Sequence, residues 1–419
     1  MNSNVQRTID AVWRMESARL IAGLARMVRD VGLAEELAQD ALVVALEQWP
    51  ATGVPDNPGA WLMATAKRRA IDHLRRRKML DRKHEELGRE RDAEEMAVPD
   101  LDEQLDDDIG DDLLRLIFTA CHPVLSTEAR AALTLRLLGG LTTDEIARAF
   151  LVAEPTIAQR IVRAKRTLAE EKVPIEVPRG PELAERISSV LEVIYLIFNE
   201  GYTATAGDDW MRPTLCEEAL RLGRVLAELE QEEPEVHALV ALMEIQASRT
   251  RARVGPGGEP VLLLEQNRAL WDQLLIRRGL AALARSEQSG RPRGPYGFQA
   301  AIAACHARAR SAHETDWHRI ASLYAELAQV NPSPVVELNR AVAVSMADGP
   351  AAGLEIVDRL SDEPLLKNYH LLPSVRGDFL HKLGRLAEAR DEFERAATMT
   401  RNERERALLM ARAAGCAGT

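Results

Sequence analysis

Residues 141–168, LTTDEIARAFLVAEPTIAQRIVRAKRTL, decide the fold of the region around them. Thr142 is followed three residues later by Glu145, the spacing of a capping box, so a helix is expected to start there. Residues 151–154 predict a turn, and Pro155 suits the first position of a second helix because its fixed φ is already helical. Two short helices joined by a tight turn are typical of a helix-turn-helix.

The second predicted helix has two chemically different faces. Ile157, Ile161, Ala164 and Leu168 recur at helical spacing and predict a buried stripe, with Lys165 at its rim. In a helix-turn-helix the opposite face enters the major groove of DNA. The candidates for base reading are Thr156, Gln159 and Arg160, and those for phosphate contact are Arg163 and Arg166. A basic face alone would also fit a solvated helix, but the paired helices, cap and turn favour DNA binding.

Composition indicates a helical, multidomain chain. It has 419 residues, of which 46% are hydrophobic and 4% aromatic. This length predicts about two to four domains. Apolar residues recur at helical spacing with hardly any alternating segments, so we expect an all-α fold. No apolar run reaches about 18 residues and the first residues lack a signal pattern, which favours a cytoplasmic protein without a membrane segment.

Residue types with catalytic or metal-binding chemistry are scattered. Cys121, Cys216, Cys305 and Cys416 lie far apart without a C-x-x-C pair, so neither a disulfide framework nor a zinc site is indicated. Only His122 beside Cys121 leaves redox or metal chemistry open. No nucleophile–base pair or phosphate-binding glycine loop is present. We therefore expect no enzymatic activity, cofactor or metal.

Charge is segmented along the chain. The net charge of −11 argues against a protein that covers nucleic acid with its whole surface. Positive residues concentrate between Lys67 and Lys83 and in the second helix of the helix-turn-helix. Residues 85–112 contain fourteen acidic residues and two arginines, so we expect a disordered or partly helical tether there.

The N-terminal region predicts three helices. Residues 17–49 have apolar residues at helical spacing, interrupted at Gly32, and the second helix is expected to end before Pro50. A loop rich in proline and glycine then leads into AWLMATAKRRAIDHLRRRKML, residues 60–80. This helix combines an apolar face with many cations, so we expect it to lie against nucleic acid.

Three motifs in this order carry a resemblance to a known family. AEELAQDALVVALEQW (34–49), NPGAWLMATAKRRAIDHLRR (57–76) and the helix-turn-helix resemble bacterial group 4, or extracytoplasmic function (ECF), RNA polymerase sigma factors, over residues 7–172. The resemblance implies core RNA polymerase and promoter DNA as partners. In that family the first motif, in domain σ2, binds the β′ clamp helices, and Glu36, Gln39 and Asp40 match the contact positions.

The second motif corresponds to the part of σ2 that melts and holds the −10 element. Unstacked bases are bound by cationic grooves with stacking surfaces. The resemblance implies these candidates: Trp61, Lys67, Arg68, Arg69, Asp72, His73, Arg75 and Arg76. Trp61 also lies on an apolar face and fits core packing, and Asp72 could equally hold an arginine.

The helix-turn-helix corresponds to domain σ4, which reads the −35 element and meets the polymerase β flap. Ala158 and Gln159 stand where the family often has a lysine and a serine, so the promoter sequence does not transfer.

The C-terminal half extends beyond an ordinary family member. Gly377, Leu380, Ala389, Phe393 and Ala396 fit the small and large positions of a tetratricopeptide (TPR) helix pair. The pattern recurs 36 residues earlier, from Ala341 to Leu360. These repeats predict a superhelical interaction surface.

With the FNEGY segment at residues 198–202, this extension resembles the ECF42-like subgroup, whose fused helical domain is thought to control sigma activity. A regulatory protein or ligand could then bind at the repeats. The residues of a possible regulatory contact are Asn199, Glu200, Tyr202, Asp208, Asp209 and Trp210. A capped turn with packed aromatic side chains explains them as well.

The sequence thus predicts an ECF sigma factor with a regulatory helical extension. The expected segments are σ2 at 7–83, the acidic linker at 84–112, σ4 at 113–172, a proline-rich linker at 173–182, a helical domain at 183–290 and TPR-like repeats at 291–419. The alternative is a one-component helix-turn-helix regulator whose repeat domain binds a ligand or a protein.

Overall fold

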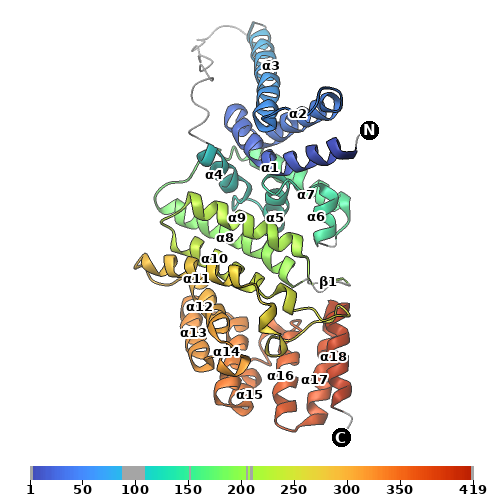
Figure 1. Cartoon of the computed structure of the whole chain (residues 1–419). Helices are drawn as coiled ribbons and strands as arrows, with labels where there is room; N and C mark the ends of the chain where they lie inside the picture. Colours follow the sequence, from blue (N-terminus) through green and yellow to red (C-terminus); the bar gives the residue numbers. More distant parts are fainter. Residues whose placement is uncertain (1–2, 87–108, 151, 204–205, 208–210, 417–419) are drawn as a thin grey trace. The chain divides into compact units, whose positions relative to one another are not determined.

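The chain forms two compact units, Met1–Ile194 (unit 1) and Tyr195–Thr419 (unit 2) (Figure 1). The computed structural model describes residues 3–86, 109–150, 152–203, 206–207 and 211–416. In these ranges nearly all regular structure is helical, in agreement with the expected all-α class. No helix within them combines the length and apolar composition that crossing a membrane requires.

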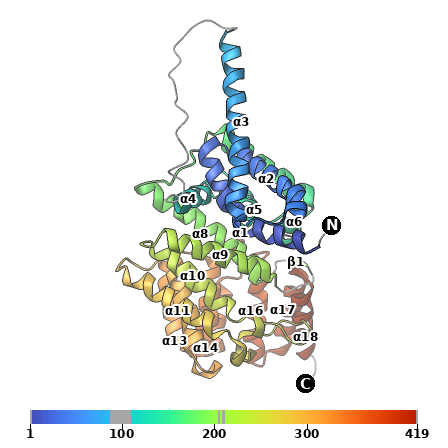
Figure 2. The same ribbon diagram turned by 45° about the horizontal axis from the view of Figure 1, so that its top comes forward.

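Unit 1 contains an N-terminal module, helices α1 to α3, and a helix-turn-helix module, helices α4 to α7. Figure 2 shows the C-terminal half of α3 extending beyond α1 and α2. The helices are α1 (Ser3–Val28), α2 (Val31–Thr52), α3 (Pro58–Glu86), α4 (Ile109–Ala120), α5 (Thr127–Leu137), α6 (Thr143–Phe150) and α7 (Glu154–Glu170). The residues 87–108 of the expected acidic tether lie outside the described ranges, and α4 begins in its last residues.

The N-terminal helices break at a different residue from the predicted one. Gly32 lies inside α2, and the break falls at Arg29, whose φ of 54° is left-handed, and Asp30. The Asp30 carboxylate accepts a hydrogen bond from the Leu33 N–H at 2.9 Å and caps α2. A side-chain cap at this point defines the helix start, whereas a glycine only permits a break.

The predicted end of α2 before Pro50 was also wrong. The helix continues through Pro50 to Thr52. Proline removes only its own N–H donor, which would have bonded the carbonyl four residues earlier. The next turn still forms, because the Gly53 N–H donates to the Trp49 carbonyl at 3.0 Å. Gly53 has a φ of 86°, a conformation that favours glycine at this helix end.

Helix α8 (Pro181–Tyr202) begins within the last residues of the expected proline-rich linker, and its residues as far as Ile194 belong to unit 1. The Arg186 guanidinium donates to the Phe118 carbonyl of α4 at 2.7 Å. Ser189 accepts a hydrogen bond from Arg130 of α5 and donates to the Cys121 carbonyl at 2.6 Å. The helix-turn-helix module is therefore completed by residues beyond its predicted end at 172.

Unit 2 is built from successive helices and two minimal strands. Strands β1 (Ala206–Gly207) and β2 (Arg401–Asn402) pair in parallel and are too short to form a layer. The helices are α9 (Pro213–Leu229), α10 (Pro234–Ala247), α11 (Gln273–Gln288), α12 (Pro295–Arg308), α13 (Trp317–Val330), α14 (Pro334–Asp348), α15 (Pro350–Arg359), α16 (Leu371–Lys382), α17 (Leu386–Met399) and α18 (Glu403–Gly415). Single 3-10 turns are η1 (Thr250–Ala252), η2 (Leu263–Glu265), η3 (Arg268–Leu270), η4 (Ala312–Glu314) and η5 (Pro364–Leu366).

The repeated small residues lie where helices approach closely. A Cβ atom on Gly353 of α15 would lie 2.6 Å from the Ser345 Cβ of α14 and 2.9 Å from the Phe379 ring of α16. A Cβ atom on Gly377 of α16 would likewise lie 2.9 Å from the Phe393 ring of α17. The repeat pattern therefore corresponds to helix packing, and its identity as a TPR array stays a prediction.

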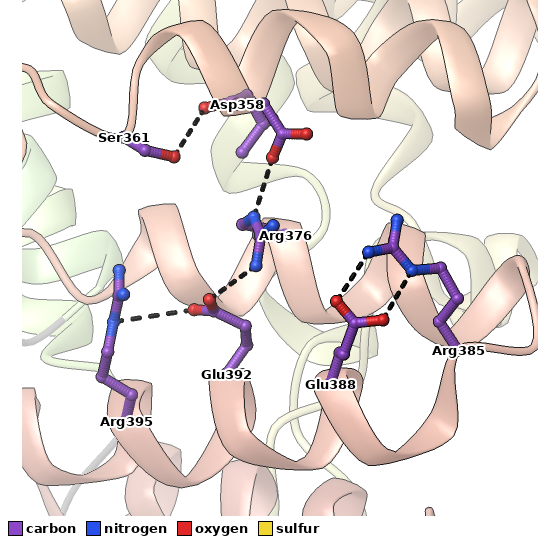
Figure 3. Close-up of polar contacts among 8 residues, drawn as sticks. Asp358, Ser361, Arg376, Arg385, Glu388, Glu392 and Arg395 are labelled. Carbon is purple, nitrogen blue, oxygen red and sulfur yellow. Dashed lines mark hydrogen bonds and ion pairs between the residues drawn. The ribbon is translucent and has the colours of Figure 1, made fainter.

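Polar contacts surround these apolar joints. Arg376 of α16 bridges Asp358 of α15 and Glu392 of α17, with N–O distances of 2.8 Å to each (Figure 3). Glu392 is 8% exposed and lies 3.6 Å from Arg395 as well. Three consecutive helices are thus joined through one guanidinium.

Candidate nucleic-acid interface

The helix-turn-helix begins as its capping box predicts. The Thr142 N–H donates to the Glu145 carboxylate at 2.8 Å, and the Glu145 N–H donates to the Thr142 hydroxyl at 3.2 Å. Helix α7 starts at Glu154, one residue before Pro155, and Ala153 is its N-cap. Proline is therefore the second helical residue, where a missing N–H still costs no helical hydrogen bond.

The two predicted faces of α7 are present. The stripe of Ile157, Ile161, Ala164 and Leu168 is buried. On the other face Thr156, Gln159, Arg163 and Arg166 are exposed, while Arg160 is half-buried. These exposed side chains are accessible to a groove of DNA.

Two of the basic candidates on α7, Arg160 and Arg166, lie near carboxylates. Arg166 lies 2.6 Å from Glu170 in a pair that is 75% and 58% exposed, so water screens it and the cation can exchange partners. The pKa of Glu128 is lowered, first by hydrogen bonds at the start of α5 and further by the Arg160 charge. Arg160 of α7 therefore lies close enough to Glu128 of α5 for the two charges to attract each other.

On α3 most of the proposed −10 side chains are exposed. Arg68, Arg69, Asp72, His73, Arg75 and Arg76 are exposed, and Lys67 is half-buried. No ion pair joins Asp72 to an arginine whose side chain is described, so the second interpretation of this aspartate gains no support. Most of the basic face of α3 is thus exposed to solvent as far as Arg76.

Trp61 combines packing with partial exposure. Its ring lies 5.3 Å from the ring of Trp49 at an interplanar angle of 66°, an edge-to-face arrangement. Trp49 is 1% exposed, whereas Trp61 is half-buried. Trp61 therefore covers the core with part of its ring, in line with the packing interpretation.

The proposed polymerase-contact residues lie on one helix but differ in environment. Glu36 and Asp40 are exposed, while Gln39 is half-buried and donates to Glu35 at 2.6 Å. Asp40 forms an ion pair with Arg69 of α3 at 2.7 Å. The polymerase-contact candidate Asp40 and the −10 candidate Arg69 are thus partners in one exposed ion pair.

Sequence reasoning missed the residue that joins the two modules. Glu35 of α2 is 3% exposed, and its carboxylate accepts from Arg136 Nε, at the end of α5, at 2.6 Å. Lys165 of α7 also pairs with Glu35. Two sequence signals were available. Glu35 is the single carboxylate among the buried positions of α2, and Lys165 is the cation at the rim of the α7 stripe.

Further ion pairs cross the same boundary. Arg14 of α1 lies 2.9 Å from Glu145, the capping residue of α6. Arg26 of α1 lies 3.4 Å from Asp112 of α4, which is also 2.6 Å from Arg115. Within unit 1 the N-terminal and helix-turn-helix modules therefore pack on each other through charged contacts.

The proposed regulatory segment is only partly described. Tyr202 stacks on Phe198 with ring centroids 5.5 Å apart, and Arg253 lies 3.5 Å from the Tyr202 centroid. Buried Glu200 pairs with Arg212, and Asn199 is exposed. Asp208, Asp209 and Trp210 lie outside the described residues. Glu200 and Tyr202 thus have packing partners within unit 2.

Cys121 is buried, and His122 beside it is half-buried. Burial raises the pKa of the Cys121 thiol to about 11, so it stays protonated, and it contacts the Thr134 hydroxyl at 3.4 Å. Burial also lowers the pKa of His122. Within the described ranges no group of three histidine, cysteine or acidic side chains could hold a metal ion.

Family comparisons divide the chain into three matched segments. The sigma-70 region 2 family matches residues 13–79, which include α2 and most of α3. The sigma-70 region 4 family matches residues 115–168, which include the helix-turn-helix. A family of unknown function (DUF6596) matches residues 186–287.

Individual relatives agree with this division. Uncharacterized protein R00370 of Rhizobium meliloti is 43% identical over 391 residues, which are 93% of this chain and 91% of that protein. The ECF RNA polymerase sigma factor SigK of Mycobacterium bovis is 30% identical over 158 residues, 36% of this chain and 78% of SigK. The probable ECF sigma factor SigI of Mycobacterium tuberculosis is 27% identical over 165 residues, and the chain spans 56% of its length. Because its N-terminal part covers most of SigK and carries both sigma-70 regions in order, the chain belongs to the family of ECF RNA polymerase sigma factors.

Proposed function

We propose that this sigma factor binds core RNA polymerase through α2, holds the melted −10 element on α3 and reads the −35 element with α7. The β′ clamp helices would contact Glu36, Gln39 and Asp40, and the β flap would contact the helix-turn-helix module. Promoter recognition would take place in the cytoplasm, without an enzymatic step in this chain. The observation that carries this proposal is the order of the two sigma-70 regions, each with an exposed basic helix face.

The face of α7 supports a division of labour along the helix. Thr156, Gln159 and Arg160 lie near its N-terminus, where side chains of a groove-bound helix meet base edges. Arg163 and Arg166 follow one and two turns later and would bind phosphate. Changing the first group should alter which promoters are used, and changing the second should weaken binding to all promoters alike.

In vitro transcription with purified core polymerase on a library of genomic fragments tests the proposal. The full chain should start transcription at specific sites. The double variant Arg163→Gln and Arg166→Gln should reduce initiation at each site. It should also reduce the slope of log K for DNA binding against log salt concentration by about one to two, as expected for one or two lost phosphate contacts. The double variant Arg19→Gln and Arg179→Gln, at exposed positions of unit 1 outside the proposed contacts, removes the same number of cations and should leave initiation unchanged.

Failure to initiate and to bind core polymerase would contradict the proposal. Specific binding of a DNA fragment without polymerase would then favour the one-component regulator. The region 2 match at residues 13–79 counts against that alternative, because a one-component regulator needs no polymerase-docking module.

We further propose that unit 2 regulates initiation through a surface of its helix pairs. A chain ending at Ile194 tests this better than one ending at Lys172, because Arg186 and Ser189 contact α4, α5 and the residue after α4. Equal initiation by the full and shortened chains would contradict a regulatory role. A gain or a loss on shortening would give the sign of control. Exposed Asn199 stays a proposed contact, whereas the partners of Glu200 and Tyr202 support a role in packing.

A further inference from the structure

A cavity of about 880 Å³ lies where the two modules of unit 1 meet. Its wall comes from the end of α1, the start of α2, α4, α7 and the segment that follows α7. This volume falls in the range of sites that hold small ligands. Five of the lining side chains are cationic: Arg26, Arg29, Arg115, Lys165 and Lys172.

The acidic side chains near the cavity do not balance these cations. The lining contains two carboxylates, Asp30 and Glu176. Asp30 is already used as the cap of α2 through the Leu33 N–H. Arg26 and Arg115 share Asp112, and Lys165 shares Glu35 with a second cation.

Arg29 and Lys172 stand apart from the other cations. Both side chains are exposed at the cavity wall, and no carboxylate among the described residues forms an ion pair with either. Their backbone conformations are also unusual. With φ of 54° and 50°, they are the two non-glycine residues of the described chain in the left-handed region.

The two left-handed residues, Arg29 and Lys172, line the same cavity, which indicates that their positions there are constrained. A long side chain at positive φ costs free energy that the surrounding structure must hold in place, and such residues cluster at ligand-binding sites. Glycine would satisfy both turns more readily. The chain instead has a cation at each turn, and both line the same cavity.

The cavity is separate from the proposed DNA-reading face. Its α7 wall is Lys165, Leu168 and Ala169, and Leu168 is the last residue of the buried stripe. Thr156, Gln159, Arg163 and Arg166 do not line it. A half-open cavity whose wall combines both modules fits a compact anion better than the side of an extended duplex.

We propose that this cavity binds a small anion with two or more phosphoryl groups. Arginine and lysine N–H groups bind phosphoryl oxygens through charge-assisted hydrogen bonds. Arg26 and Arg29 belong to the N-terminal module. Lys165 lies on α7 of the helix-turn-helix module, and Lys172 lies in the segment directly after α7. A bound anion therefore contacts both modules. It therefore stabilises the packed arrangement of the two modules over any arrangement in which they separate.

A consequence for regulation rests on the proposed sigma function. If polymerase and promoter bind the two modules when they are apart, the anion lowers polymerase affinity by favouring the packed arrangement. The anion site itself is tested without polymerase, so the two proposals can fail separately.

Isothermal titration calorimetry of the full chain with pyrophosphate tests the site, with sodium chloride of matched ionic strength as the blank titration. We expect saturable binding of one pyrophosphate per chain. Arg29→Asn and Lys172→Asn should each weaken it roughly tenfold, since each removes one charged contact. Asparagine accepts the left-handed backbone, so both variants should remain folded by circular dichroism.

Arg19→Asn is the matched control, because Arg19 is an exposed cation of α1 that does not line the cavity. It should bind pyrophosphate as the unchanged chain does. Absence of saturable heat, or equal binding by the folded Arg29 and Lys172 variants and the control, would overturn the proposal. Loss of duplex DNA binding in the same two variants, without loss of pyrophosphate binding, would also overturn it and assign these cations to DNA.

A polymerase-binding assay with and without pyrophosphate then examines the consequence. Reduced polymerase affinity in the unchanged chain, but not in Arg29→Asn, is the expected result. Calorimetric binding without any polymerase binding would contradict the sigma function and leave the anion site standing. Transcription without calorimetric binding would contradict the anion site alone.

Discussion

The joint between the two modules of unit 1 and the joints between helix pairs of unit 2 are made of different chemistry. In unit 1 a buried carboxylate, Glu35, meets cations from α5 and α7. In unit 2 glycines meet the rings of Phe379 and Phe393. Charged groups recover hydration when they separate, whereas exposing apolar surfaces to water raises the free energy. The first joint is therefore suited to opening, and the second to holding a fixed shape.

Breaking the apolar joint should have the largest effect. Phe393 is 1% exposed and packs against Gly377, so Phe393→Ala removes a buried ring and leaves a cavity. We expect a loss of about 3–5 kcal/mol in the free energy of unfolding of unit 2, measured by denaturant titration. Leu365→Ala, at a side chain that is 77% exposed, is the control and should change stability by less than about 0.5 kcal/mol. A loss in Phe393→Ala as small as in the control would show that this joint is not rigid.

Breaking the polar joint should have a smaller and more local effect. Glu35→Gln keeps the shape of the side chain but leaves Arg136 and Lys165 without their shared charge. Their side chains are 23% and 21% exposed, so water compensates part of the loss. We expect a cost of about 2 kcal/mol, below the usual range for a fully buried pair.

Amide hydrogen exchange measures this opening directly. In Glu35→Gln, exchange at the module boundary of α2 and α7 should rise, while exchange in unit 2 stays unchanged. Glu47→Gln, an exposed carboxylate on the same helix, should leave exchange in both regions as it is. Exchange that rises equally in both variants would indicate that Glu35 contributes nothing specific to the joint.

The same contrast explains what the sequence could predict. The helix-turn-helix was predictable because its cap, turn and apolar stripe are contained in 28 consecutive residues, and each signal acts on its own helix. The Gly353 and Gly377 contacts were accessible through their repeat. The Glu35–Arg136 pair joins residues 101 positions apart, and no local pattern selects one partner among many cations.

The predicted helix ends were wrong for a related reason. Gly32 was expected to interrupt the first two helices because glycine weakens helices, but the Asp30 cap determined where α2 starts. The left-handed backbone of Arg29 and Lys172 gave no sequence signal at all, since arginine and lysine do not mark such turns. The sequence therefore shows that these residues are basic, but it does not predict that they line one cavity.

Acid should weaken the C-terminal unit through one buried histidine. Burial, with the nearby Arg249 and Arg268 charges, lowers the pKa of His306 to about 3 from its ordinary 6.5. Below pH 6.5 the unfolded chain binds a proton that the folded chain excludes, so stability falls as pH falls toward 3. At pH 5 the loss should reach about 1–2 kcal/mol relative to pH 7.

Denaturant titrations of unit 2 at pH 7 and pH 5 measure this dependence. His306→Gln removes the titrating group and should reduce the difference between the two pH values, even if its stability at pH 7 is lower. His318→Gln is the control, because His318 is 76% exposed. An unchanged pH dependence in His306→Gln would contradict the assignment to this ring.

The smallest effect should come from the polar contacts that surround the apolar joint. Arg376 reaches Asp358 and Glu392 on two different helices, which the forked guanidinium allows and the single ammonium of lysine does not. Arg376→Lys should therefore cost about 0.5–1 kcal/mol in the unfolding of unit 2, since the packing of Gly377 and Phe393 remains. Arg385→Lys affects an exposed pair at the start of α17, between the residue before the helix and Glu388 in its first turn. This change should leave the denaturation midpoint unchanged. A loss in Arg376→Lys as large as that in Phe393→Ala would mean that charge, and not apolar packing, holds the helix pairs together, and the contrast between the two units would disappear.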